Sequence, residues 1–415
     1  MLEGFNRELE GAASVRGTGI VAGLLLGAAA FAHHALADPW DGTIAPIRLA
    51  PGDLSLTLGA EAGSAVFGAS GIHLPGASGA GGKQNVSGDF KFIPRLTRDF
   101  DTGWSLGLNA TITTSDPLSR GRYNGGTIEK AFGDLRFGLG QVQIGDTDGA
   151  AYGLAVTGPK VDPGVSLDDP QTTFFRDPST KRAFTGIFLL RAEVGASSNY
   201  AKFVYQSPAL FGVQLALSFT PEQSRYGVPF LHEGQHVAGR QVDIWEGAVK
   251  YSDELWPVTV SAYGGAAVGR AEHKLAGQEG VSDLGAGLRL DYPVNDDLSL
   301  SAGGAYRQSN AYAFQITKSY QAGTTRVMQA SAAATYDSWV LGFEYGGGNA
   351  DAVGGAPRLK LNGYQASLGY DFSSSIQVSS GWQRLIYQRS SGAFYNGLPR
   401  VNLDAVFLHL NLKTQ

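Results

Sequence analysis

The chain of 415 residues has no cysteine and little charge, and it contains no long apolar run beyond Ala37. Without cysteine it can have neither a disulfide framework nor a thiolate metal site. Charged residues make up 17%, against about 25% in ordinary globular proteins. No segment after Ala37 approaches the roughly 20 consecutive apolar residues that a membrane helix needs. The net charge of -5 is spread along the chain, so no nucleic-acid partner is expected.

The one continuous apolar run lies near the start, over residues 19–32 (GIVAGLLLGAAAFA), and is followed by Ala35-Leu36-Ala37. An apolar run of this length that ends on an A-x-A site is typical of a secretion signal. The sequence therefore predicts a signal peptide over residues 1–37 and an exported mature protein that begins at Asp38. Residues 38–52 are predicted to form a short periplasmic lead-in, and residues 53–415 the main domain.

From Asp53 onward, apolar residues alternate with small or polar ones, as in the run from Trp104 to Ile112. Alternation of period two predicts strands with one apolar and one polar face. Sixteen such runs are present: 53–62, 86–98, 104–114, 127–137, 140–145, 199–206, 210–220, 241–252, 256–267, 281–292, 297–308, 326–337, 339–348, 359–372, 375–389 and 401–412.

The connections between these runs alternate strictly between short turns and long loops. The long ones are residues 63–85, 115–126, 145–198, 220–240, 268–280, 308–326, 349–358 and 390–400. This alternation predicts an antiparallel up-and-down meander whose two ends differ. The apolar phase changes at Gly138-Leu139-Gly140, which predicts a tight turn there. It also slips near Trp245 and Ala405, where either a bulge or a misplaced strand boundary would account for it.

Aromatic residues gather at the short-turn ends of the strands: Phe100, Trp104, Phe211, Trp256, Tyr292, Tyr336, Trp339, Tyr370 and Phe372. Amphipathic rings settle where lipid meets water, and strands of about ten residues suit a tilted crossing of the hydrocarbon layer. The sequence therefore predicts an all-β fold, a closed 16-stranded antiparallel transmembrane β-barrel. Its apolar face would meet lipid and its polar face would line a lumen.

The third long connection, Gly145–Ser198, is far longer than the others, and such a loop is usually functional or disordered. Its apolar content, which includes Phe174, Phe175 and Leu190, argues against disorder. We expect a folded constriction loop over residues 146–198 that enters the lumen, with Asp162, Asp168 and Asp169 nearest the lumen axis. The loop's acidic residues are Asp146, Asp148, Asp162, Asp168, Asp169, Asp177 and Glu193.

Basic residues fall on the lumen-facing phase of several strands. They are Lys91, Arg95, Arg136, Lys202, Arg289 and Arg307. Acidic residues on an inserted loop that face basic residues on the wall would create a transverse field across a narrow water path, and such charges set ion selectivity. The alternative is that these charges merely keep the lumen solvated.

The sequence gives little support for a phosphate-binding loop or a metal site. Residues 76–84 (GASGAGGKQ) depart from a phosphate-binding loop, because Gln84 stands where a magnesium-binding Ser or Thr is needed. His232 and His236 lie in a long loop without a helical pattern, so no metal site is expected there. Calcium binding at Asp146-Thr147-Asp148-Gly149 is left as an open alternative, although the other ligands of a calcium loop are missing. We expect no cofactor.

The segments that flank the third loop point to a family. Residues 137–150 (FGLGQVQIGDTDGA) resemble the strand that leads into the constriction loop of porins, and residues 199–214 (NYAKFVYQSPALFGVQ) resemble the next two strands around a Ser-Pro turn. The chain thus resembles the general, non-specific outer-membrane porins of Gram-negative bacteria, of an alphaproteobacterial kind. One departure is the end of the chain, Leu412-Lys413-Thr414-Gln415, where such porins carry a terminal aromatic residue.

The resemblance implies a passive diffusion channel for ions and small hydrophilic solutes across the outer membrane, without catalysis. It also implies a homotrimer with the first and last strands and the second loop at the interface, surrounded by outer-membrane lipid and lipopolysaccharide. The alternative is an outer-membrane barrel that acts as an adhesin or as a lipid-acting enzyme. An enzyme would need a Ser, His and acid set at one strand end, and none is evident.

Overall fold

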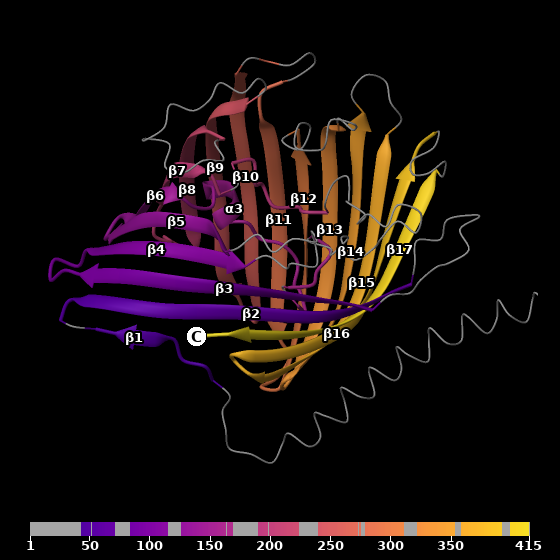
Figure 1. Cartoon of the computed structure of the whole chain (residues 1–415), viewed down its shortest axis with the longest axis horizontal. Coiled ribbons are helices and arrows are strands. Elements are labelled where there is room, and N and C mark those ends of the chain that lie inside the picture. Colours follow the sequence, from indigo (N-terminus) through magenta and orange to yellow (C-terminus); the bar gives the residue numbers. More distant parts are fainter. Residues whose placement is uncertain are drawn as a thin grey trace, which may run out of the picture.

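The computed structural model describes most of the predicted barrel (Figure 1). The residues described are 43–50, 52–70, 84–114, 126–162, 164–168, 190–197, 199–223, 240–272, 274, 279–310, 322–352, 358–391 and 399–414. The predicted signal peptide lies outside them. Among the described residues, no helix is long and apolar enough to span a membrane.

Sixteen strands, β2 to β17, form a closed antiparallel barrel in which each strand pairs with its neighbours along the chain. The barrel closes where β17 pairs with β2, from Asp404 opposite Ser70 to Lys413 opposite Glu61. The strands are β1 (Ile47–Leu49), β2 (Leu54–Ser70), β3 (Gln84–Asp99), β4 (Ser105–Thr114), β5 (Gly126–Phe137), β6 (Gly140–Asp146), β7 (Ala201–Gln206), β8 (Val213–Glu222), β9 (Arg240–Leu255), β10 (Val258–Glu272), β11 (Ser282–Pro293), β12 (Leu298–Ser309), β13 (Ala322–Tyr336), β14 (Trp339–Ala352), β15 (Leu359–Ser373), β16 (Ile376–Arg389) and β17 (Arg400–Lys413).

The sixteen predicted runs therefore correspond to β2–β17, which confirms the predicted fold class. One short strand was not expected: β1, inside the predicted lead-in, pairs with β2 at Leu56–Leu58. The last strand, β17, leaves this part of β2 uncovered, since its pairing stops at Glu61. The short strand β1 thus pairs with the part of β2 that β17 does not cover.

The alternating pattern places apolar side chains on the outside. In β8, Leu215 and Leu217 are exposed, whereas Ala216 and Ser218 between them are buried. Seven of the nine aromatic residues at the short turns are also exposed, most of all Phe211 and Trp256, whereas Trp339 and Tyr370 are half-buried. A large apolar outer face is unfavourable in water, but it is the face that a transmembrane barrel presents to lipid.

The three local phase changes have different explanations. The change at residues 138–140 is the predicted tight turn between β5 and β6, where Gly140 adopts a φ of 131° that favours glycine. Near Trp245 the β9–β10 pairing shifts register between Val268 and Arg270, so of the two alternatives a bulge, and not a misplaced strand boundary, accounts for the change there.

Near Ala405 no bulge exists, because β17 pairs without interruption with both β16 and β2. The apparent slip arises because both faces of β17 are apolar. The inward side chains of Leu403, Ala405 and Phe407 are buried in a hydrophobic cluster inside the barrel. That cluster also contains Leu167 and Leu190 of the third loop, so the loop contributes to an internal core.

Candidate functional site

The third loop begins with one helical turn, α3 (Ala150–Gly153), which lies beside β7–β10 (Figure 1). The backbone N–H of Ala150 donates to the Ser218 hydroxyl at 3.0 Å, and that of Ala151 donates to the Glu246 carboxylate at 3.2 Å. The other Glu246 oxygen accepts the N–H of Ser197, at the far end of the loop, at 3.1 Å. A buried carboxylate on β9 therefore holds both ends of the loop.

From α3 the described part of the loop follows the inward-facing side of the barrel, where glycines make room for it. A Cβ at Gly287 of β11 would overlap the carbonyl oxygen of Val156, and one at Gly342 of β14 would overlap the side chain of Val161. A Cβ at Gly363 of β15 would lie 2.7 Å from Leu190. Part of the chain's high glycine content thus serves close packing between loop and wall.

The loop reaches β16 and β17 at Asp162, whose side chain is 0% exposed. Its carboxylate accepts a hydrogen bond from the Ser379 hydroxyl and lies 2.7 Å from Nδ1 of His409. It also accepts the N–H of Gly164 at 2.7 Å. Burial favours the neutral acid, but the hydrogen bonds and charge of His409, together with those from Ser379 and Gly164, outweigh burial and lower the pKa of Asp162.

Two further loop acids share one lysine of the loop. The ammonium group of Lys160 contacts the carboxylate of Asp168 and lies 3.6 Å from that of Glu193. Burial would lower the pKa of Lys160, but these carboxylates raise it. Burial would raise the pKa of Asp168, but its contacts with Lys160 and Ser166 lower it. The pair is therefore ionised, although Asp168 is only 6% exposed.

Other carboxylates and amides of the wall bind the loop backbone. Glu344 of β14 accepts the N–H of Leu167 at 3.2 Å, and Gln365 of β15 donates to the carbonyl of Val165 at 2.7 Å. These wall residues, with Ser379, His409 and Glu246, were not singled out by sequence reasoning. Alternation assigns them to the inward face, but every inward position shares that signal.

The predicted basic residues of the wall divide into two groups. Lys202 is buried and donates to the carbonyl of Thr147 at 2.5 Å, and Arg307 is buried and forms a two-point ion pair with Asp283. Lys91, Arg95 and Arg136 are 36%, 34% and 48% exposed in their side chains. The first group packs beneath or beside the loop, and the second is partly exposed on the inner face of the barrel.

The exposed group forms a charged patch on β2, β3 and β5. Asp134 is buried and lies 3.1 Å from Arg136 and 3.9 Å from Arg95. Lys91 lies 3.9 Å from Glu61. Arg289 of β11, which is also partly exposed, pairs with Asp291 at 2.8 Å.

The predicted acids of the loop lie in different surroundings. Asp146 is half-buried at the end of β6, and Asp148 pairs with Lys130 at 2.6 Å. Asp162, Asp168 and Glu193 are buried, so the expectation that Asp162 and Asp168 reach the lumen axis does not hold for these side chains. They are buried because the loop lies close against the wall. Asp169 and Asp177 lie outside the described residues.

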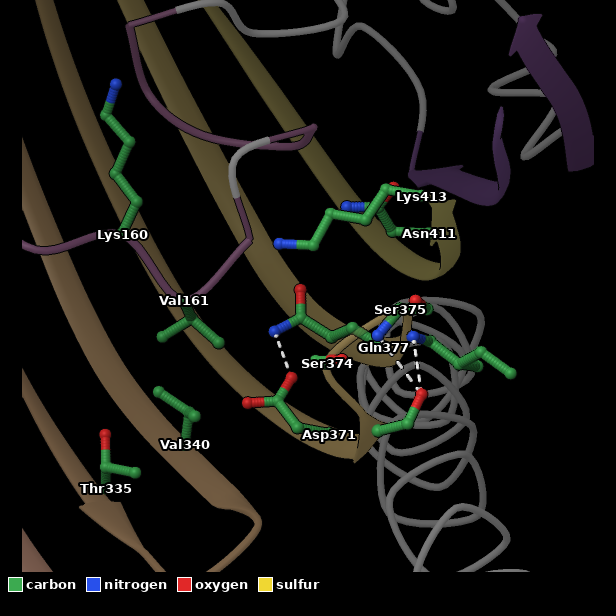
Figure 2. A pocket seen from close by; sticks show the side chains of 12 residues that line it. Lys160, Val161, Thr335, Val340, Asp371, Ser374, Ser375, Gln377, Asn411 and Lys413 are labelled. Atoms are coloured by element: carbon green, nitrogen blue, oxygen red, sulfur yellow. Dashed lines mark hydrogen bonds between the residues drawn. The ribbon is translucent and has the colours of Figure 1, made fainter. Parts of the chain in front are cut away.

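A polar cavity of about 450 Å³ separates the loop segment Lys160–Val161 from the short-turn ends of β13–β17. Figure 2 shows Lys413 directed into it and the ammonium group of Lys160 directed away from it. Within its lining, Gln377 donates to Asp371 at 2.7 Å. Among the described residues, no cluster of His, Asp and Glu is arranged to hold a metal ion.

The comparisons with known proteins agree with this architecture. Solved structures with the same fold include DcaP, an outer membrane channel of Acinetobacter baumannii (TM-score 0.57, 12% identity, covering 89% of this chain and 100% of that chain). OmpF of Salmonella typhi, solved with daunomycin, has a TM-score of 0.56 at 12% identity, over 88% of this chain and 100% of the other. An anion-selective porin from Comamonas acidovorans has a TM-score of 0.55 at 13% identity, over 87% and 99%.

No curated protein sequence matches the chain significantly. The sequence model of the Gram-negative porin family, however, matches residues 23–385. This match covers most of the chain and is independent of the structural likeness. The chain therefore belongs to the Gram-negative porins and is an outer-membrane channel for small solutes.

Proposed function

We propose that solutes and ions diffuse passively through a water path bounded on one side by the third loop and on the other by the patch formed by Glu61, Lys91, Arg95, Asp134 and Arg136. The observation that carries this proposal is the asymmetry of the inner wall. The described loop packs against inward side chains of β8–β17, whereas Lys91, Arg95 and Arg136 on β3 and β5 stay partly exposed.

In this proposal the predicted site residues have two roles. Asp162, Lys202 and Arg307 hold the loop or the wall beside it, because they are buried and fully engaged. Lys91, Arg95 and Arg136 set the potential of the water path, because partly exposed charges act on passing ions. Asp146, Asp148, Asp168, Asp169, Asp177 and Glu193 add the negative field of the loop, and Arg289 adds to the positive wall.

We also infer that the protein is not an enzyme. A serine nucleophile needs its hydroxyl within hydrogen-bond reach of a general base. Ser379, Asp162 and His409 lie together, but the Ser379 hydroxyl donates to the carboxylate rather than to the imidazole. Among the described residues, this arrangement holds a loop in place and does not activate a nucleophile.

The experiment that tests the channel is single-channel conductance in a planar bilayer. Deletion of about residues 160–185 removes the part of the loop that crosses to β17, and we expect a wider pore with higher conductance. As a control, Lys274→Gln alters an exposed residue of another loop and should leave conductance unchanged. A purified, folded protein without conductance would contradict the channel, whereas unchanged conductance after the deletion would contradict only the role of the loop.

We further propose a homotrimer. The supporting comparison is OmpT of Vibrio cholerae, solved in a trimer form, which shares the fold at a TM-score of 0.50 and 10% identity. The first and last strands and the second loop would form the interface, as the family resemblance implies. Chemical cross-linking of the protein in native membranes should give a three-subunit species, and a product that stops at one subunit would contradict the trimer.

A further inference from the structure

The polar cavity of about 450 Å³ at the short-turn ends of β13–β17 has the size of a small-molecule site. One side of it carries charge, from Lys413 and Asp371, with the amide of Gln377 between them (Figure 2). The other side is formed by Val161 of the third loop and Val340 of β14 (Figure 2). The cavity therefore offers a ligand both charged and apolar contacts.

The strand register explains why the polar side chains share one face of the wall. Asp371 pairs with Gln377 and Gln377 pairs with Asn411, so these three residues form a row across β15, β16 and β17. Lys413 lies two residues beyond Asn411 and shares the phase of His409, which contacts the loop inside the barrel. With strands about 4.8 Å apart and about 3.4 Å per residue, the Cα atoms of Asp371 and Lys413 are about 12 Å apart. Their side chains reach toward each other across that separation (Figure 2).

Both charges are available to a ligand. Among the described residues, no carboxylate pairs with Lys413 and no cation pairs with Asp371. One oxygen of Asp371 accepts a hydrogen bond from Gln377 at 2.7 Å, and the other faces the cavity without a partner in this part of the structure. The ammonium group of Lys160 is directed away and contacts Asp168 instead. The cavity thus presents one positive and one negative charge, with no net charge.

The backbone around the charge pair is held by hydrogen bonds at the β15–β16 turn. The Ser373 hydroxyl accepts the N–H groups of Ser375 and Ile376, each at 3.1 Å. The Ser375 hydroxyl accepts the N–H of Ile44 at 2.8 Å. The N–H of Lys413 donates to the carbonyl of Ser375 at 2.9 Å. A site whose backbone is already fixed loses less conformational entropy when a ligand binds.

We propose that this cavity is a transient binding site for zwitterionic solutes of the amino-acid class that carry a small aliphatic side chain. The carboxylate of the solute binds Lys413 and its ammonium group binds the free oxygen of Asp371, through charge-assisted hydrogen bonds. The aliphatic part contacts Val161 and Val340, which removes apolar surface from water. The site rests on the proposed function, since the water path is what brings outside solutes to it. It lies on the short-turn side of the loop, which is periplasmic in barrels of this kind.

The charge pair favours a zwitterion over an ion of a single sign. A simple anion at Lys413 is repelled by Asp371, and a simple cation at Asp371 is repelled by Lys413. An α-amino acid carries both charges on one carbon atom and satisfies both side chains at once. Because the ammonium group of Lys413 is exposed, the contacts are screened by salt and the binding is weak and reversible, as passage of a solute requires.

The test measures binding of three probes to the purified protein in neutral detergent by saturation-transfer NMR, at neutral pH and low salt. The probes are L-valine, 3-methylbutanoate, which is valine without its ammonium group, and isobutylamine, which is valine without its carboxylate. We expect wild type to bind L-valine about fivefold more tightly than either analogue, since each charged contact contributes about as much as an exposed ion pair. This comparison needs only wild type, so it does not depend on the folding of any variant.

Two variants then assign the two charges. Lys413→Gln should weaken binding of L-valine and 3-methylbutanoate about fivefold without weakening that of isobutylamine. Asp371→Asn should weaken binding of L-valine and isobutylamine without weakening that of 3-methylbutanoate. The matched controls Lys274→Gln and Asp296→Asn remove exposed charges elsewhere on the barrel and should bind all three probes as wild type does.

Three outcomes would overturn the site. Equal binding of L-valine and 3-methylbutanoate by wild type would show a site for anions, and equal binding of all three probes would show apolar contact alone. Binding of L-valine that neither variant weakens would place the amino acid elsewhere. A protein that conducts ions but does not bind L-valine contradicts only this site, whereas a folded protein without conductance contradicts the channel, so the two failures are distinguishable.

Discussion

Asp162 and His409 show how one buried pair fixes the part of a long loop that reaches β17. Their separation in sequence is 247 residues, yet the carboxylate and imidazole lie 2.7 Å apart with almost no contact with water. Ser379 and the N–H of Gly164 complete the carboxylate's hydrogen bonds. A buried polar group that loses its hydrogen-bond partner still pays the full free-energy cost of desolvation. Breaking any one of these contacts is therefore costly, and together they hold the loop at Asp162 against β16 and β17.

Asp162→Asn tests that attachment. The amide keeps the shape of the carboxylate but has one oxygen in place of two, so it cannot reproduce both the contact with His409 and the bonds from Ser379 and Gly164. We expect loop attachment to weaken by about 1–3 kcal/mol. The measurement is the current noise of the open channel, which should rise as the loop moves. Asp148→Asn, at a partly exposed ion pair with Lys130, should change the noise little; equal noise in both variants would contradict the assignment.

The Lys160–Asp168 pair predicts a pH window. The pKa of Asp168 is lowered in the folded protein, so its contribution is present above the unfolded value of about 3.9 and is lost as pH falls through the lower, folded value. The pKa of Lys160 is raised, so its contribution is present below the unfolded value of about 10.4 and is lost as pH rises through the higher, folded value.

The pair should therefore stay ionised between about pH 4 and pH 10. Conductance is compared between wild type and the double variant Lys160→Met, Asp168→Asn over this range. We expect a constant ratio of the two conductances inside the window and a changing ratio beyond either end. A ratio that changes near pH 7 would show that other groups control the loop.

At the scale of the strands, the two faces should respond oppositely to charge. Leu215 of β8 and Leu288 of β11 are exposed on the lipid side, so arginine at either position should cost about 2–4 kcal/mol. Gln214→Arg, on the inward face, should be far milder, with loss of one hydrogen bond to the carbonyl of Ser207. Urea titration of the folded fraction in lipid vesicles measures the difference. Equal losses at positions 214 and 215 would mean that the faces are assigned wrongly.

The strands were predictable because alternation is a local signal. Period two identifies β2–β17 and, with the phase change at residues 138–140, the turn between β5 and β6. The same signal fails where both faces are apolar, as at Leu403–Phe407 of β17, because the loop's Leu167 and Leu190 cover the inner face there. The sequence shows no partner for β1, since its pairing with β2 depends on where β17 ends.

The candidate site was predictable as a set of residue types but not as an arrangement. Sequence reasoning identified the loop and its charges. It could not tell that Lys202 and Arg307 would be buried while Arg95 and Arg136 stayed partly exposed, since all four share the inward phase. That division depends on the path of the loop, which is fixed by contacts such as Asp162 with Ser379, 217 residues apart.

At the scale of the whole molecule, ion selectivity should depend more on the wall than on the loop. Asp162, Asp168 and Glu193 are buried and engaged by His409 or Lys160, so their carboxylates contact passing ions less directly than the partly exposed cations of the wall do. The double variant Arg95→Gln, Arg136→Gln removes two partly exposed cations beside the buried Asp134. We expect it to shift selectivity toward cations more than Asp168→Asn, Asp169→Asn shifts it toward anions.

Both shifts should be modest. A unit charge attracts an ion at 4 Å by about 1 kcal/mol in water, and the Debye length falls from about 10 Å at 0.1 M salt to about 3 Å at 1 M. The zero-current potential across a tenfold salt gradient, measured around 0.1 M and again around 1 M, should separate the variants at low salt and bring them together at high salt. A larger shift in zero-current potential from the loop variant at low salt would show that the loop, and not the wall, sets ion selectivity. No shift from the wall variant would exclude Arg95 and Arg136 from the water path.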